Sequence, residues 1–114
     1  MNYDPHPKFD FGLGIEARLN ADLALESVGR ASAALGSAIA GHVPIDHAYA
    51  IRRVQLASVF AAAAGGHADN ATDAEYAGSS MRAIHHRDQS RRLVRAAAYA
   101  SSRLRRHIAR RASA

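Results

Sequence analysis

The sequence predicts an all-α protein, a small three- or four-helix bundle preceded by an extended N-terminal arm. Alanine, the strongest helix former, contributes 27 of the 114 residues. Apolar side chains recur at steps of three and four residues, as they do on the buried face of a helix. The sequence has no alternating runs rich in β-branched residues, which would indicate strands. We expect one bundle domain over residues 15–114, because a chain of this length fits a single core.

The same composition limits the size of that core. Ile, Leu, Val and Phe together number 22, so alanine must supply much of the packing surface although each alanine buries little area. We therefore expect close, alanine-lined helix contacts, and a partner or a second copy of the chain that completes the core; a homo-oligomer is expected. The absence of cysteine excludes disulfides and thiolate zinc sites.

Residues 1–14 are predicted to form the extended arm. Pro5 and Pro7 fix the backbone angle φ and disfavour a helix. Phe9, Phe11 and Leu13 alternate, so an extended chain would place these three apolar side chains on one side. They either fold back over the bundle or form a docking motif for a partner. Folding back is the favoured alternative, because an exposed apolar trio promotes aggregation.

The first helix is predicted over residues 15–40 and ends at Gly41. Three alanines, Ala24, Ala31 and Ala38, are expected to flank its buried seam and to allow close approach of a neighbouring helix. The seam itself follows alternating steps of four and three residues. Its members are Ala21, Leu25, Val28, Ser32, Leu35 and Ile39.

The second helix is predicted over residues 44–64. Pro44 suits a first helical turn, and the pair Gly65–Gly66 is expected to end the helix before a polar loop. Apolar residues lie on two of its faces, one with Phe60 and the other with Ile51. A helix that is apolar on two faces is expected to lie centrally in the fold.

The segment Thr72–Glu75 fits a capping box and predicts the start of a third helix. Its apolar positions fall on nearly the opposite side from those further along, so we expect a break at His86 to Asp88. Asp88 would then cap a fourth helix over residues 89–110. The alternative is one long helix that contacts two partners.

Charge is divided along the chain. Residues 1–76 carry a net charge of −4, whereas residues 77–114 carry ten arginines and one acid, a net charge of +9. On the last predicted helix, an apolar stripe (Leu93, Ala97, Ala100, Leu104 and Ile108) opposes a face that is almost entirely guanidinium. That face consists of Arg92, Arg95, Tyr99, Arg103, Arg106 and Arg110.

A helix face of one charge sign is unfavourable unless an anion relieves the repulsion. We therefore expect a non-enzymatic accessory protein that binds DNA or RNA through the phosphate backbone, with Tyr99 stacking on a base. Low sequence specificity is expected, because no helix-turn-helix, zinc-finger, RRM or zipper pattern is present.

The alternative is a helical interaction protein, encoded by a phage or another mobile element, that binds a protein partner or assembles with itself. An acidic protein surface would then neutralise the arginine face. The acidic front half could itself be that surface, in another copy or in the same molecule.

The sequence gives little support to catalysis or to metal binding. Catalytic triads, paired carboxylates and Gly-rich phosphate loops are absent, so we expect neither an enzyme nor a cofactor. His85 and His86 with Asp88 form the densest group of metal-ligand residue types, but a third ligand would have to come from elsewhere, such as His67, and we predict no metal site. No signal peptide or membrane-spanning run is found, which predicts a cytoplasmic protein.

Overall fold

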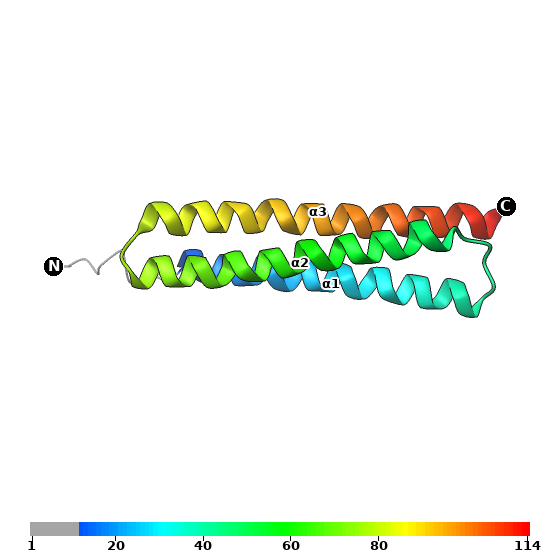
Figure 1. The fold of residues 1–114 in the computed structure, drawn as a ribbon, viewed down its shortest axis with the longest axis horizontal. Coiled ribbons are helices and arrows are strands. Elements are labelled where there is room, and N and C mark those ends of the chain that lie inside the picture. The colour runs from blue at the N-terminus through cyan, green and yellow to red at the C-terminus, as the bar shows by residue number, and fades with distance from the viewer. Residues whose placement is uncertain (1–11) are drawn as a thin grey trace.

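The computed structural model describes residues 12–114, which form three long α-helices in an up-down-up bundle. Helix α1 covers Gly12–Ala40, α2 covers His47–Tyr76 and α3 covers Ser80–Ser113. The α1–α2 loop and the C-terminus lie at one end, and the α2–α3 loop lies at the other (Figure 1). The principal extents are 66 × 23 × 16 Å, so the bundle is a thin rod. The predicted all-α bundle is confirmed, with three helices.

Small side chains at every seventh position form the core. Strict seven-residue spacing keeps one seam of each helix turned toward its neighbours, as in a left-handed coiled coil. Each residue in this repeat is at most 3 % exposed. The repeat consists of Ala17, Ala24, Ala31 and Ala38 in α1, Ala50, Ala57, Ala64 and Ala71 in α2, and Ala83, Ser90, Ala97 and Leu104 in α3.

The seam predicted for the first helix is correct only in part. Leu25 and Ile39 are 58 % and 51 % exposed, whereas the alanines expected to flank the seam are themselves the core. The physical reason is size: at Ala24, Ala31 and Ala38 the small side chain lets the helix backbones approach closely, and that approach keeps the larger side chains at Leu25 and Ile39 on the outside. Of the other seam members, Ala21, Val28 and Leu35 pack into the core and Ser32 is exposed.

The first helix ends as predicted, but the second begins three residues later than expected. After Ala40 the chain turns through His42, whose φ is 55°. Pro44 lies in the loop, and α2 begins at His47 because Asp46 is the better cap: its carboxylate accepts the Tyr49 amide N–H at 3.0 Å.

The predicted end of the second helix at Gly65–Gly66 is wrong, and α2 continues to Tyr76. Two helical glycines cost about 2 kcal/mol together relative to alanine, but the buried alanines on either side hold the helix against its neighbours. The predicted capping box therefore lies inside α2. The Thr72 hydroxyl donates to the Ala68 carbonyl at 3.2 Å, and the buried Glu75 carboxylate accepts the Gly14 amide at 2.7 Å.

The break predicted at His86 to Asp88 is also wrong, and the alternative of one long helix is correct. The turn instead lies just after Tyr76, where Gly78 has a φ of 78° and Ser79 caps α3. The predicted break depends on an apolar face that contains Met81 and Ile84. These side chains are 84 % and 41 % exposed, so in residues 12–114 they pack into no second core.

Helix α1 begins at Gly12, so the last three residues of the predicted arm belong to this helix, and the rest of the predicted arm lies outside the described residues. Residues 12–14 are helical, and Gly14 is buried against α2, where its amide reaches the Glu75 carboxylate. Leu13 is half-buried in the first turn of α1. The other two residues of the predicted docking motif, Phe9 and Phe11, lie outside the described residues.

Candidate nucleic-acid interface

The predicted arginine face is a continuous row along α3, which we call the arginine row. Its members are exposed, apart from Arg103, which is half-buried; the Tyr99 side chain is 55 % exposed. The row extends over about 27 Å at a helical rise of 1.5 Å per residue. It comprises Arg92, Arg95, Tyr99, Arg103, Arg106 and Arg110.

The opposite side of α3 packs into the core, which leaves the arginine row facing solvent. Ala97, Ala100 and Leu104 are buried, while Leu93 and Ile108 are half-buried against the two core clusters. The predicted apolar stripe is therefore confirmed. Because it is anchored between α1 and α2, the helix cannot rotate to bury its arginines, and the row stays on the solvent side.

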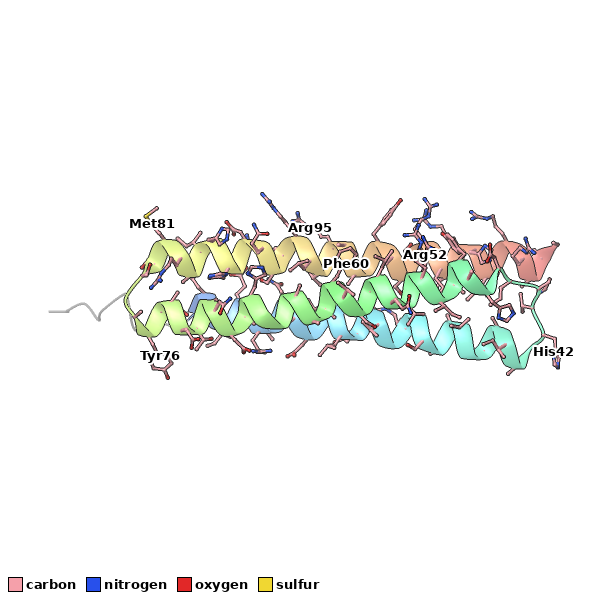
Figure 2. The ribbon with its side chains drawn as sticks, in the orientation of Figure 1. His42, Arg52, Phe60, Tyr76, Met81 and Arg95 are labelled. Atoms are coloured by element: carbon pink, nitrogen blue, oxygen red, sulfur yellow. The ribbon has the colours of Figure 1, made fainter. Side chains whose placement is uncertain are left out.

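Helix α2 adds basic and aromatic groups that the sequence interpretation did not include. The Arg53 Cζ atom lies 5.0 Å from the centroid of the Tyr49 ring. On α3, Arg103 Nη1 donates to the Tyr99 hydroxyl at 3.1 Å. Figure 2 shows Arg95 near the middle of the rod and Arg52 closer to the α1–α2 loop.

The division of charge along the sequence becomes a division along the rod. We define the basic end as residues 27–61 and 97–114, the half of the bundle next to the α1–α2 loop. It contains eight arginines and one carboxylate, Asp46, a net charge of +7. The other half of the described chain contains six arginines and seven carboxylates. Antiparallel packing of α2 produces this arrangement, because it brings Arg52 and Arg53 beside the C-terminal part of α3.

Among residues 12–114, the carboxylates of the acidic half do not form ion pairs with the arginine row of the same molecule. Glu16 of α1 forms ion pairs with Arg87, at 3.0 Å, and with Arg91. Arg18 pairs with Asp69 of α2. Within residues 12–114, no carboxylate lies within 4.0 Å of a guanidinium nitrogen of the row. The contacts of Arg87 and Arg91 tie α3 to α1 and leave the row available.

Two pKa shifts describe these electrostatics. Burial of Glu16 opposes its ionisation, but hydrogen bonds from Arg87 and Arg91 outweigh burial and hold the pKa of Glu16 below its ordinary value. At the basic end, the Arg103 guanidinium beside the Tyr49 hydroxyl lowers the pKa of Tyr49; Arg53 adds to this shift, and burial opposes it.

A histidine cluster joins α2 and α3 nearer the opposite end. His67 Nδ1 and His86 Nδ1 lie 2.8 Å apart and share one hydrogen bond, and the His85 ring centroid is 5.1 Å from that of His86. Burial lowers the pKa of His86, and the charges of its neighbours His67, His85 and Arg82 lower it further. Over residues 12–114, no group of three or more His, Asp or Glu side chains is arranged to hold a metal ion.

An apolar hollow lies at the end of the rod where α1 begins. Its volume is about 350 Å³, and it is open to solvent beside the exposed side chains of Ile15 and Leu19, which are 60 % and 57 % accessible. Leu13, the one described residue of the predicted docking motif, lies on the same first turns of α1. The lining residues are Gly14, Ile15, Arg18, Leu19, Thr72 and Tyr76.

Comparison of this chain with protein-family models, with curated proteins and with solved structures finds no match. In the part of the chain that the structure describes, no helix combines the length and the apolar character needed to cross a bilayer.

Proposed function

We propose that this protein binds nucleic acid, DNA or RNA, through the phosphate backbone. The observation that carries the proposal is the arginine row: five guanidinium groups on one face of a straight helix, with no ion-pair partner within residues 12–114. Phosphates relieve the mutual repulsion of such a row, because each contact releases a condensed counterion and replaces it with a guanidinium.

The dimensions of the row favour a long anionic polymer. Duplex DNA carries about one negative charge per 1.7 Å of its axis, so a row of about 27 Å passes many phosphates. Arg52 and Arg53 widen the basic surface from α3 onto α2. Guanidinium groups that contact phosphates carry little sequence information, which favours binding of low specificity. The exposed ring of Tyr99 offers a stacking surface to an unpaired base.

The test is binding to duplex and single-stranded oligonucleotides as a function of salt concentration. Five neutralised phosphates predict a log–log slope of about −4 to −5 on duplex DNA. The double variant Arg95→Glu with Arg103→Glu is expected to lose binding. A matched control, Arg82→Glu with Arg105→Glu, makes the same change in net charge outside the row and is expected to keep most of the affinity. Equal losses in the two variants, or no binding at low salt, would contradict the proposal.

A second candidate function is association with a protein partner or with another copy of the chain. The exposed apolar surface favours it: eleven large hydrophobic side chains are exposed, whereas Leu104 is the one large apolar side chain with less than 2 % exposure in residues 12–114. The test is the oligomeric state by light scattering. In this candidate, Leu19→Gln, or Phe9→Ala with Phe11→Ala, dissociates the assembly while the arginine variants do not. Under both proposals the protein acts in the cytoplasm.

A further inference from the structure

Two arginines from neighbouring helices converge on one tyrosine at the basic end. Arg53 of α2 is half-buried, and its Cζ lies 5.0 Å from the centroid of the Tyr49 ring. Arg103 of α3 reaches the same region and donates to the Tyr99 hydroxyl at 3.1 Å. The lowered pKa of Tyr49 reflects the two guanidinium groups beside its hydroxyl, with Arg103 contributing most.

These two arginines have no counterion in the part of the chain that the structure describes. Within residues 12–114, neither Arg53 nor Arg103 forms an ion pair. The Nε atom of Arg53 is buried and has no hydrogen-bond acceptor. A buried N–H of a charged group without an acceptor is unfavourable, and an anion that supplies the acceptor removes this cost. Together, the converging guanidinium groups and the unsatisfied donor point to an anionic ligand.

The surroundings of this cluster are held in place before any ligand arrives. The Tyr49 ring packs on the His107 ring, with centroids 4.9 Å apart. The Asp46 amide donates to His107 Nε2 at 3.0 Å, and the Asp46 carboxylate accepts the Tyr49 amide at 3.0 Å. An open hollow of about 370 Å³ adjoins the cluster, lined by Asp46, Ala48, Tyr49, Arg52 and Arg53.

We infer that Arg53, Tyr49 and Arg103 form a discrete binding site for a phosphate group, the point at which one backbone phosphate is held between α2 and α3. The guanidinium fork matches the geometry of phosphate oxygens, and two forks from different helices grip one anion more firmly than a row of separate charges. The Tyr49 hydroxyl supplies a further donor. The carboxylate of Asp46 opposes the ligand, although it is engaged as the cap of α2. This inference rests on the proposed function.

The experiment is a calorimetric titration of the full chain with inorganic phosphate at low salt. Wild-type protein is expected to bind one phosphate saturably, at about millimolar concentration. Arg53→Gln is expected to weaken this affinity about tenfold or more. Arg105→Gln, the matched control, removes the same charge from the basic end outside the cluster and is expected to change the affinity less than about twofold. Circular dichroism confirms that each variant is folded.

A second variant tests the site in the opposite direction. Asp46→Asn keeps a good cap for α2 but removes the negative charge beside the hollow, so phosphate affinity is expected to rise. No saturable phosphate binding in wild-type protein, or equal effects of Arg53→Gln and Arg105→Gln, would overturn the inference.

A parallel arm with an oligonucleotide separates the two proposals. If the oligonucleotide binds but phosphate does not saturate, the discrete site is wrong and the arginine row still binds nucleic acid. In the other outcome, phosphate binds saturably, Arg53→Gln abolishes phosphate binding, and no oligonucleotide binds. The site is then one for a free phosphate compound, and the proposed nucleic-acid function is wrong.

Discussion

Two glycines inside the helices give the sharpest test of the bundle. Gly29 of α1 and Gly66 of α2 are exposed, and a Cβ atom built on either one meets nothing within 4 Å beyond the adjacent backbone of its own helix. Replacing each by alanine therefore adds helix propensity without a clash, about 0.8–1 kcal/mol per site. For a chain of this length, about 4–5 °C of melting temperature corresponds to 1 kcal/mol. The double variant Gly29→Ala with Gly66→Ala is expected to melt about 7–9 °C above wild type.

Gly14 provides the contrasting control, because it is also helical but is buried between α1 and α2. A Cβ atom there would lie 2.7 Å from Thr72 Oγ1 and 3.2 Å from Thr72 Cα. Gly14→Ala must push the two helices apart, and we expect it to destabilise the protein by about 1–3 kcal/mol.

The assay is thermal unfolding followed by far-ultraviolet circular dichroism at several protein concentrations. The reasoning is refuted if Gly29→Ala with Gly66→Ala lowers the melting temperature as Gly14→Ala does. That result would show that another copy of the chain covers these helix faces, and the loss would grow as protein concentration rises.

Three further predictions concern the interior. Ala64→Leu overpacks the core and is expected to destabilise the bundle by about 1–3 kcal/mol, whereas Ala62→Leu, on the exposed side of the same turn, changes stability by less than about 0.5 kcal/mol in urea denaturation. Ser101→Ala removes a buried hydroxyl that has no hydrogen-bond partner within residues 12–114, so the same denaturation is expected to show a gain of about 1 kcal/mol. The pKa of His86 is lowered in the folded state, so the contribution of His86 to the free energy of unfolding is fully present above its unfolded pKa of 6.5 and is lost as the pH falls through its folded pKa. His86→Gln is expected to flatten that part of the curve of stability against pH. An unchanged curve would contradict the assignment.

The sequence predicted the class of fold and the amphipathic helix because those depend on local periodicity. Steps of three and four residues place Leu93, Ala97 and Leu104 on one face whatever they pack against, and the arginines then occupy the other face. Local propensity likewise predicts the end of the first helix at Gly41 and, from the excess of alanine, a helical chain; the structure confirms both.

The wrong predictions concern positions where packing between helices decides the structure and local sequence pattern does not. Gly65–Gly66 was expected to stop a helix, but buried alanines nearby hold it together. The steps of four and three predict a buried seam through Leu25 and Ile39, whereas along α1 the alanines at every seventh position occupy the core. Alanine at every seventh position was the signal that would have corrected both errors, since it continues through the two glycines without a break in phase.

The part of the site on α2 could not be found from local pattern. Whether Tyr49 and Arg53 face α3 depends on which side of α2 packs against it, and that is set by contacts between distant residues. The hydrogen bond from Asp46 to His107 joins positions 61 residues apart. Periodicity within one helix contains no information on such a pairing.

The repeating alanine seam does not by itself determine how the helices are aligned along the axis of the rod. Sliding one helix past another by seven residues, about 10 Å, returns a small residue to nearly every core position, so the seam alone does not distinguish one alignment from the next. Three polar contacts that occur once favour a single alignment: Glu75 with the Gly14 amide, Asn20 with Ser90, and His107 with the Asp46 amide. These hydrogen bonds along the rod disfavour a slipped bundle, the misfolded state that a repeating core would otherwise tolerate.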